Sequence, residues 1–276
     1  MDSVVVTGAA SGIGRAVASR LIETGWSLVL VDKDANKLID VQNEIGLLSA
    51  KSSAQEVEAV VGDVSDPSTH FEAGSRAESL GQLTGWVNCA GITVQNSLDQ
   101  LSVETSRLIV DVNQMGTLWG TSEAITRMIR NKGSASIVNV SSVHGRLAFP
   151  DYAVYEMTKA AIDALTRNAA VSYGSFGIRA NAVAPGAVMT EALVASLASA
   201  KSAAAAESEL EARNALGRIA RPAEIASVVC FLLSDAASYL TGQSIAVDGG
   251  WTATLGRAST DPNAKRINGG SEDVTQ

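Results

Sequence analysis

The stretch that decides the fold is Val4-Val5-Val6-Thr7-Gly8-Ala9-Ala10-Ser11-Gly12-Ile13-Gly14, near the start of the chain. Its first half is a β-branched run, which is typical of a buried strand. Its second half is a glycine-rich turn that opens a segment with apolar residues at helical spacing. Glycines permit a tight turn, and the free N–H groups at a helix N-terminus attract an anion such as a pyrophosphate. The pattern predicts a phosphate-binding strand–turn–helix unit, although glycines alone also fit a turn without a ligand.

Asp32 follows the second apolar run, about 20 residues beyond the glycines. A carboxylate at this place can accept hydrogen bonds from the hydroxyls of an adenosine ribose, and it would repel a 2′-phosphate. Asp32 therefore favours NAD over NADP, while the neighbouring Lys33 favours the opposite choice. The alternative is that Asp32 serves only as a helix N-cap or turn residue.

Short apolar runs alternate with helical patterns along the rest of the chain. This alternation predicts an α/β protein of the three-layer Rossmann type, with a doubly wound parallel sheet of seven strands and ligands at the carboxyl ends of the strands. A single domain is expected over 1–254, with a helical, mobile lid over the Ala- and Ser-rich segment 190–213 and a polar, poorly ordered tail over 255–276. The expected strands are 3–6, 28–31, 58–61, 85–88, 136–140, 178–183 and 244–247, and the expected helices are 13–24, 35–48, 67–80, 103–130, 152–173 and 222–233.

Composition excludes several classes of protein. The 276 residues carry a net charge of -8, which disfavours binding to nucleic acid. Two cysteines and two histidines without ligand spacing predict neither a disulfide framework nor a metal site, and free thiols suit a reducing cytoplasm. The run Val4-Val5-Val6 ends at once in Thr7-Gly8, so no secretory signal and no membrane span is expected.

Further motifs make the pattern resemble a known family, the short-chain dehydrogenases/reductases in their shorter single-domain type. The glycine spacing Gly8-(three residues)-Gly12-Ile13-Gly14 is that family's own. Asn88-Cys89-Ala90-Gly91 resembles its motif after the fourth strand, although Cys89 stands where Asn is more usual, and Asp63-Val64 resembles its adenine-contacting pair. Pro185-Gly186, followed by Val188 and Thr190, resembles its nicotinamide-side loop, so the resemblance covers the chain from Val4 to about Thr252.

Tyr155 and Lys159 are four residues apart on an expected helix, so both project from one face. A free phenol ionises only near pH 10, and a neighbouring ammonium favours its ionised form. The spacing suits a general acid/base pair, but it also fits a surface pair on an amphipathic helix. Ser142 lies just beyond an expected strand and could bind a substrate oxygen; Ser141 competes for this role, and the resemblance favours Ser142.

Asn113 is a polar residue inside the expected helix 103–130, where Asn is unfavourable unless its amide finds partners. The resemblance implies that it holds a water linked to Lys159, whereas the alternative is a helix kink or a satisfied buried amide. The catalytic residues implied are Asn113, Ser142, Tyr155 and Lys159. The cofactor-binding residues implied are Gly8, Ser11, Gly12, Ile13, Gly14, Asp32, Asp63, Val64, Asn88, Ala90, Gly91, Tyr155, Lys159, Pro185, Gly186, Val188 and Thr190. The substrate-side residues expected are Ser142, His144, Phe149, Tyr152, Tyr155 and Gly186.

The function expected is an NAD-dependent oxidoreductase that interconverts a secondary alcohol and a ketone, with Tyr155 as general acid/base. Two alternatives stay open: a 3-oxoacyl-thioester reductase of the same family, and a non-catalytic dinucleotide-binding regulator. The mostly apolar pocket residues suit a small hydrophobic alcohol or ketone as substrate. A homotetramer or homodimer is expected from the resemblance alone, and Trp86, Trp119 and Trp251 are interpreted as core or subunit-interface residues.

Overall fold

A computed structural model describes residues 2–49, 55–131 and 133–254. The expected tail at 255–276 lies outside the described residues. The strands are β1 (Asp2–Thr7), β2 (Ser27–Asp32), β3 (Val57–Val61), β4 (Gln82–Asn88), β5 (Ala135–Val140), β6 (Ile178–Pro185) and β7 (Ser244–Val247). The helices are α1 (Gly12–Glu23), α2 (Ala35–Ser49), α3 (Pro67–Leu80), α4 (Val103–Ile109), α5 (Gly116–Met128), α6 (Ala153–Tyr173), α7 (Glu191–Ser199), α8 (Ala203–Glu211) and α9 (Pro222–Leu233).

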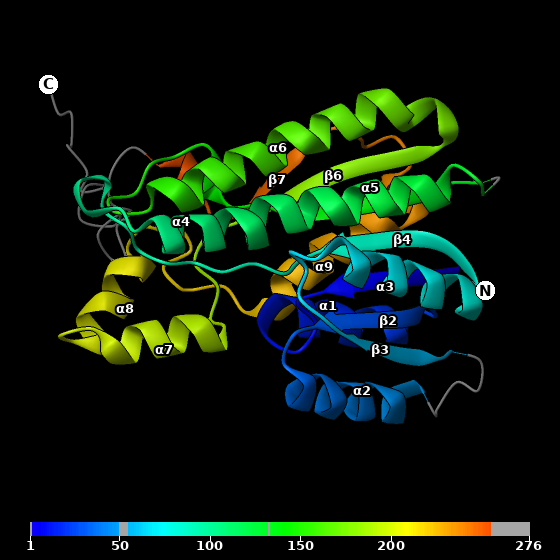
Figure 1. The fold of residues 1–276 in the computed structure, drawn as a ribbon. Coiled ribbons are helices and arrows are strands. Elements are labelled where there is room, and N and C mark those ends of the chain that lie inside the picture. Colours follow the sequence, from blue (N-terminus) through cyan, green and yellow to red (C-terminus); the bar gives the residue numbers. More distant parts are fainter. Residues whose placement is uncertain (1, 50–54, 132, 255–276) are drawn as a thin grey trace, which may run out of the picture.

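The strands form one seven-stranded sheet in the order β3-β2-β1-β4-β5-β6-β7 (Figure 1). Every recorded pairing is parallel, and β1 pairs with both β2 and β4. The chain therefore reverses its direction of winding between β1 and β4. In an open parallel sheet this point leaves a crevice beyond the carboxyl ends of the strands, where ligands bind. The predicted fold class is confirmed.

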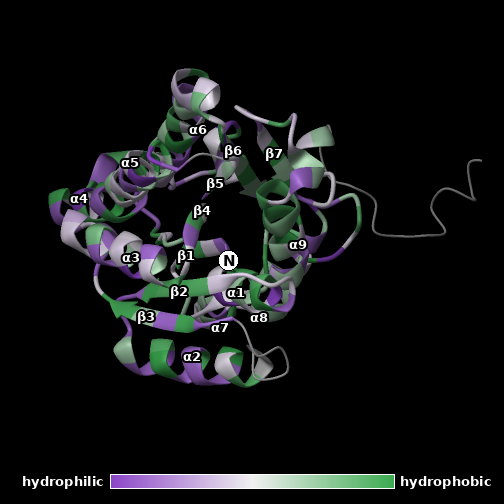
Figure 2. Ribbon diagram, turned by 90° about the vertical axis from the view of Figure 1, so that its right-hand side faces the viewer, coloured by the Kyte–Doolittle hydropathy of each residue, from purple (hydrophilic) through white to green (hydrophobic). Residues whose placement is uncertain are grey.

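Both faces of the sheet are covered because successive side chains of a strand point to opposite faces. Val4 and Val6 of β1 pack into the core beneath α1, α2 and α9, whereas Val5 packs into the core beneath α3, α5 and α6. Figure 2 shows strands that are mainly apolar and outer helices in which apolar and polar residues mix. The short apolar runs of the sequence therefore form strands buried on both sides.

The prediction of one α-helix over 103–130 is wrong. Residues Val110–Met115 form a π-helical segment between α4 and α5, and α5 ends at Met128. The side chain of Asn113 bonds the backbone of Ile92, outside the helix, with Oδ1 accepting from the Ile92 amide at 2.8 Å and Nδ2 donating to the Ile92 carbonyl at 2.9 Å. A π-helical turn is the local adjustment that accompanies such a buried polar residue.

The segment 190–213 forms two short helices, α7 and α8, at the end of the molecule away from the N-terminus (Figure 1). Thr190 caps α7 through Leu193 N, and Ser202 caps α8 through Ala205 N. The helical part of the lid prediction is confirmed.

Within the described residues, no helix from α1 to α9 combines the length and the apolar character that crossing a bilayer requires.

Candidate active site

A cavity of about 810 Å³ lies beyond the carboxyl ends of the central strands. Its wall joins the glycine turn after β1, Asp32 at the end of β2, the segment after β4, the end of β5, and the first turns of α6 and α7. The wall includes the following predicted residues: Gly8, Ser11, Gly12, Ile13, Gly14, Asp32, Asp63, Val64, Ala90, Gly91, Ser142, His144, Phe149, Tyr152, Tyr155, Lys159, Pro185, Gly186, Val188 and Thr190. Asn88 and Asn113 are the two predicted site residues that do not line it.

The glycine turn fits closely against the segment that follows β4. A Cβ atom on Gly8, whose φ is +67°, would lie 2.7 Å from Ala90 Cα, and one on Gly14 would lie 2.1 Å from the carbonyl oxygen of Gly8. The hydroxyl of Thr7 accepts hydrogen bonds from the amides of Cys89 and Ala90 at 3.0 and 3.1 Å. Only glycine fits these positions, so the backbone at the start of α1 stays accessible from the cavity.

Asp32 is held with its carboxylate at the rim of the same cavity. Its Oδ2 accepts from the amide of Ala10 at 3.1 Å, and its Oδ1 accepts from the amide of Asp34 at 3.1 Å. These two bonds give Asp32 the turn role considered from the sequence and also fix its orientation. Each carboxylate oxygen has a second acceptor site, so the group can still accept from a ribose hydroxyl.

Another part of the cavity wall includes Asp63 and Val64. His70, buried on α3, lies 2.8 Å from the carbonyl oxygen of Val64 through Nε2 and therefore supports that wall from behind. Burial lowers the pKa of His70, which keeps the ring neutral near neutral pH.

At the other end of the cavity, Lys159 lies beside Tyr155 on α6. Its Nζ is 5.5 Å from the centroid of the Tyr155 ring and donates a hydrogen bond to the carbonyl of Val140 at 2.9 Å. Lys159 is only 5% exposed. The two side chains therefore lie together in the cavity wall and are not two independent surface residues.

The two serines after β5 have different surroundings. Ser141 donates its hydroxyl to the carbonyl of Lys159 at 3.1 Å and so ties α6 to the strand end. Ser142 accepts the amide of His144 at 3.2 Å, and no acceptor for its own proton is found among the described residues. Ser142 is therefore the serine with a proton available for a ligand oxygen.

Asn113 lies close behind the wall. A Cβ atom on Gly91 would be 3.3 Å from Asn113 Oδ1 and 3.6 Å from Lys159 Nζ, so both side chains lie close to Gly91 in the cavity wall. Since the amide of Asn113 is bonded to Ile92, the buried, satisfied amide considered from the sequence describes its side chain. The water-holding role stays a prediction.

Asn88 was predicted to bind cofactor, but its side chain is buried in the layer between β4 and its neighbours. Asn88 Oδ1 accepts the indole N–H of Trp86 at 2.9 Å, and Nδ2 donates to Thr121 Oγ1 at 3.1 Å and to Asn139 Oδ1 at 2.9 Å. These bonds occupy the amide, so the side chain of Asn88 holds the core together and does not face the cavity.

Aromatic rings form the wall beyond Tyr155. The His144 ring lies 5.8 Å from that of Tyr155, 5.6 Å from Phe149 and 6.1 Å from Trp251, centroid to centroid. Its Nδ1 is 3.4 Å from Glu156 Oε1, yet burial is the larger influence and lowers the pKa of His144. Trp251 was interpreted as a core or interface residue; the structure places it in the cavity wall instead.

Sequence reasoning missed further wall residues, among them Trp251, Leu210 and Glu191. Trp251 follows the last strand by four positions, and carboxyl ends of parallel strands meet at one edge, so its position was the available signal. Cys89 also lines the cavity, and burial raises the pKa of its thiol to about 12. Glu191 and Leu210 carry no comparable signal, because they lie on two lid helices without a motif.

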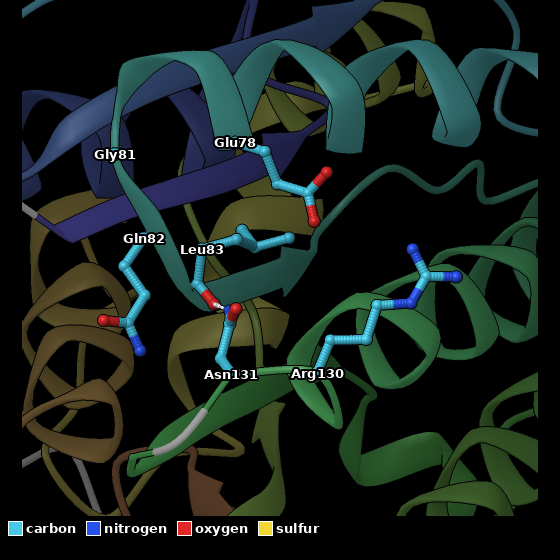
Figure 3. Close-up of a pocket in the computed structure, with 6 residues that line it drawn as sticks. All are labelled: Glu78, Gly81, Gln82, Leu83, Arg130 and Asn131. Atoms are coloured by element: carbon cyan, nitrogen blue, oxygen red, sulfur yellow. Dashed lines mark hydrogen bonds between the residues drawn. The ribbon is translucent and has the colours of Figure 1, made fainter.

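A second hollow lies at the start of β4 and is lined by Glu78, Gly81, Gln82, Leu83, Arg130 and Asn131 (Figure 3). Asn131 Nδ2 donates to the Leu83 carbonyl across it at 3.0 Å. It lies at the amino end of a strand, away from the edge where parallel sheets bind ligands. We therefore assign the site to the larger cavity.

The larger cavity has the features that a nicotinamide dinucleotide requires. The glycines leave room where a Cβ atom would collide, the first residues of α1 line the cavity, and Asp32 lies at the end of β2. The glycines and the start of α1 suit a pyrophosphate, and Asp32 suits a ribose.

Known proteins with this arrangement are similar along nearly the whole chain. A family model described as "Enoyl-(Acyl carrier protein) reductase" matches residues 8–252. The 3beta-hydroxysteroid dehydrogenase 1 of Eggerthella lenta is 34% identical over 254 residues, covering 91% of this chain and 93% of that protein. The cis-4-hydroxycyclohexanecarboxylate dehydrogenase of Sinomonas cyclohexanicum is 39% identical over 251 residues, covering 90% and 96%.

Among solved structures, a short-chain type dehydrogenase/reductase from Mycobacterium ulcerans superposes with a TM-score of 0.85 at 30% identity, covering 96% of this chain and 93% of that one. The family model, the two relatives and the solved structure thus all match nearly the same stretch of this chain. The chain belongs to the short-chain dehydrogenase/reductase family, whose members are oxidoreductases that use nicotinamide dinucleotides.

Proposed function

We propose that this protein is an NAD-dependent dehydrogenase that interconverts a secondary alcohol and a ketone, with Tyr155 as the general acid/base. One observation carries the proposal: Ser142, Tyr155 and Lys159 line the same cavity as the glycine turn and Asp32. The relatives described above support the reaction, because a hydroxysteroid dehydrogenase and a hydroxycyclohexanecarboxylate dehydrogenase both act on a carbon that carries a hydroxyl group.

NAD, when bound, supplies the hydride acceptor, and the chain supplies orientation and proton transfer. The hydroxyl of Ser142 donates a hydrogen bond to the substrate oxygen and so holds the reacting carbon near Tyr155. Tyr155 removes the hydroxyl proton during oxidation and returns it during reduction. Lys159, whose ammonium is buried 5.5 Å from the centroid of the Tyr155 ring, supports this proton transfer. Asn113 is proposed to hold a water that connects Lys159 to solvent.

The preference for NAD rests on Asp32. Its carboxylate is oriented by the amides of Ala10 and Asp34 and has acceptor capacity left for the ribose hydroxyls. A 2′-phosphate would have to approach this negative charge. Lys33, an exposed neighbour in the cavity wall, would attract such a phosphate.

The experiment is a panel of secondary alcohols, ketones and 3-oxoacyl thioesters, followed through the absorbance of reduced nicotinamide with NAD and NADP in parallel. Turnover of simple alcohols or ketones with NAD is expected. A clear preference for NADP would overturn the role of Asp32, and turnover of 3-oxoacyl thioesters alone would favour the alternative 3-oxoacyl-thioester reductase. Binding of NAD without turnover of any compound would favour a non-catalytic regulator.

We further propose that the protein is cytoplasmic and assembles as a homodimer or homotetramer. Its two cysteines are both free, which suits a reducing compartment. Apolar side chains are exposed on neighbouring elements, among them Leu98 and Val103 near α4 and Met157 and Val171 on α6. Such surface is typical of subunit contacts. Light scattering during size-exclusion chromatography is expected to give a dimer or tetramer, and a monomer at micromolar concentration would contradict the assembly.

A further inference from the structure

A cationic side chain, that of Arg213, packs against the aromatic wall of the cavity. The guanidinium carbon of Arg213 lies 4.4 Å from the centroid of the Phe149 ring and 5.5 Å from that of Trp251. Both rings line the cavity, as does Leu210, whose carbonyl accepts the backbone amide of Arg213 at 3.3 Å. Arg213 therefore lies directly behind the part of the wall that Leu210, Phe149 and Trp251 form.

The guanidinium is incompletely satisfied. Its Nη2 donates to Glu209 Oε1 at 2.7 Å. Its Nε is buried and has no hydrogen-bond partner within the described ranges 2–49, 55–131 and 133–254. A buried donor without a partner costs free energy unless a ligand or water supplies one. Glu209 is 60% exposed at its side chain, against 27% for Arg213, so solvent screens this ion pair and positive charge remains at the wall.

The backbone on both sides of this contact is fixed. Asn214, next to Arg213, donates through Nδ2 to the carbonyls of Leu210 and Arg218 at 3.0 and 3.1 Å. Asp248 accepts the amides of Gly250 and Thr252 at 3.0 and 2.7 Å and so holds Trp251 between them. The amide of Leu216 donates to the carbonyl of Gly249 at 3.1 Å and joins the two segments. Arg213 is thus preorganised against the wall and is not a freely moving surface side chain.

Another charged group near this wall already has partners. Glu156 accepts the amide of Phe149 at 2.5 Å and lies 3.4 Å from His144 Nδ1. His144 stands between Tyr155 and both Phe149 and Trp251. A substrate that reacts at Tyr155 and extends past His144 therefore reaches the rings of Phe149 and Trp251, against which the charged guanidinium of Arg213 lies.

We propose that Arg213 is the residue that selects substrates carrying a carboxylate, so that the preferred substrate is a secondary alcohol or ketone with a carboxylate several bonds from the reacting carbon. This inference rests on the proposed alcohol–ketone reaction. A guanidinium partly removed from water forms a charge-assisted hydrogen bond with a carboxylate, which is stronger than a bond between neutral groups. The aliphatic part of the same substrate contacts the aromatic rings. The proposed substrate therefore has an apolar body and an anionic end.

The test uses keto acids in which the ketone neighbours the terminal methyl group, in a series of increasing chain length, each compared with its primary amide. The amide has nearly the same shape without the charge. For the chain length that fits, kcat/KM is expected to be higher for the acid than for the amide by a factor of about ten to a hundred. Arg213→Gln is expected to remove this preference by raising KM for the acid, with kcat and the kinetics of the amide little changed. Arg213→Lys is expected to restore part of the preference.

Lys201→Gln is the matched control, because it removes the same charge from the lid at an exposed position between α7 and α8. It is expected to leave the preference intact. Equal turnover of acid and amide by the wild type would overturn the proposal, and so would a preference that survives Arg213→Gln. An equal loss of acid and amide activity together with a lower Tm would assign Arg213 a structural role only. Turnover of simple secondary alcohols in the same assays shows that the proposed function stands even where the selection by Arg213 fails.

Discussion

The carboxylate of Glu191 accepts a hydrogen bond from the backbone amide of Gly12, with Oε2 and N 2.9 Å apart. Glu191 is the first residue of α7, and Gly12 is the first residue of α1. A helix N-terminus of this kind attracts anions, and a cofactor's pyrophosphate is the anion expected there. Glu191 therefore places a negative charge of the protein where the pyrophosphate charge is expected.

Glu191→Gln is expected to strengthen binding of NAD, because the neutral amide competes less well for the Gly12 amide and no longer repels the pyrophosphate. Isothermal titration calorimetry should give a Kd about two- to fivefold lower for NAD and for ADP-ribose. Adenosine, which has no phosphate, should bind equally to both proteins. Glu207→Gln, a charge change on α8, serves as the control. Weaker binding of ADP-ribose by Glu191→Gln would show that the carboxylate supports the cofactor and does not compete with it.

Tyr155→Phe is expected to lower kcat by a factor on the order of 10²–10⁴, since it removes the group that transfers the proton while keeping the ring. The ring contact with His144 at 5.8 Å does not require the hydroxyl, so the wall should keep its shape. Kd for NAD, measured by fluorescence titration, should change little. Turnover close to that of the wild type would remove Tyr155 from its proposed role.

Asn88→Ala is expected to destabilise the fold and to leave cofactor binding nearly unchanged. The substitution leaves the Trp86 indole N–H and the Asn139 amide oxygen without their present partner in a buried layer. Each group left unpaired costs about 1–3 kcal/mol. Urea unfolding of Asn88→Ala and of Asn131→Ala, a less buried asparagine, measures the difference. A large loss of NAD affinity under conditions where Asn88→Ala is folded would restore the binding role predicted from the sequence.

His70 is expected to make the protein less stable in mild acid. Burial lowers its folded-state pKa below the ordinary value of 6.5, so between the two values the unfolded chain binds the proton and the folded chain does not. Its contribution to stability is fully present above pH 6.5 and decreases as the pH falls toward the folded-state pKa. The slope for one proton is at most about 1.4 kcal/mol per pH unit.

The measurement is the free energy of unfolding across this pH range for wild type and His70→Gln, whose amide can still donate to the Val64 carbonyl. The slope should be smaller in the variant. Some slope should remain, because burial lowers the pKa of His144 as well. Identical slopes in the two proteins would contradict the assignment to His70.

Much of the sheet was predictable because its strands are buried on both faces and therefore appear as continuous apolar runs. β7 (Ser244–Val247) and α9 (Pro222–Leu233) have the predicted bounds, while β4 (Gln82–Asn88) begins three residues earlier than expected. Its first residues, Gln82 to Thr84, include polar side chains and a half-exposed position, so hydropathy alone did not mark them. The π-helical segment Val110–Met115 has no local hydropathy signal, and the bond that Asn113 makes from it to Ile92, 21 positions away, appears only in the folded chain.

The sequence by itself determined the order of strands and helices, the glycine turn, Asp32 at a strand end and the one-turn spacing of Tyr155 and Lys159. Each of these depends on residues that are close along the chain, so hydropathy, turn chemistry and helical period suffice to identify them. Tertiary structure alone decided that Asn88 bonds within the core, that Trp251 joins the wall near His144 with Arg213 packed against its ring, and that Glu191 meets Gly12 across 179 positions. These contacts form because a parallel sheet brings the carboxyl ends of distant strands, and the segments that follow them, to one edge.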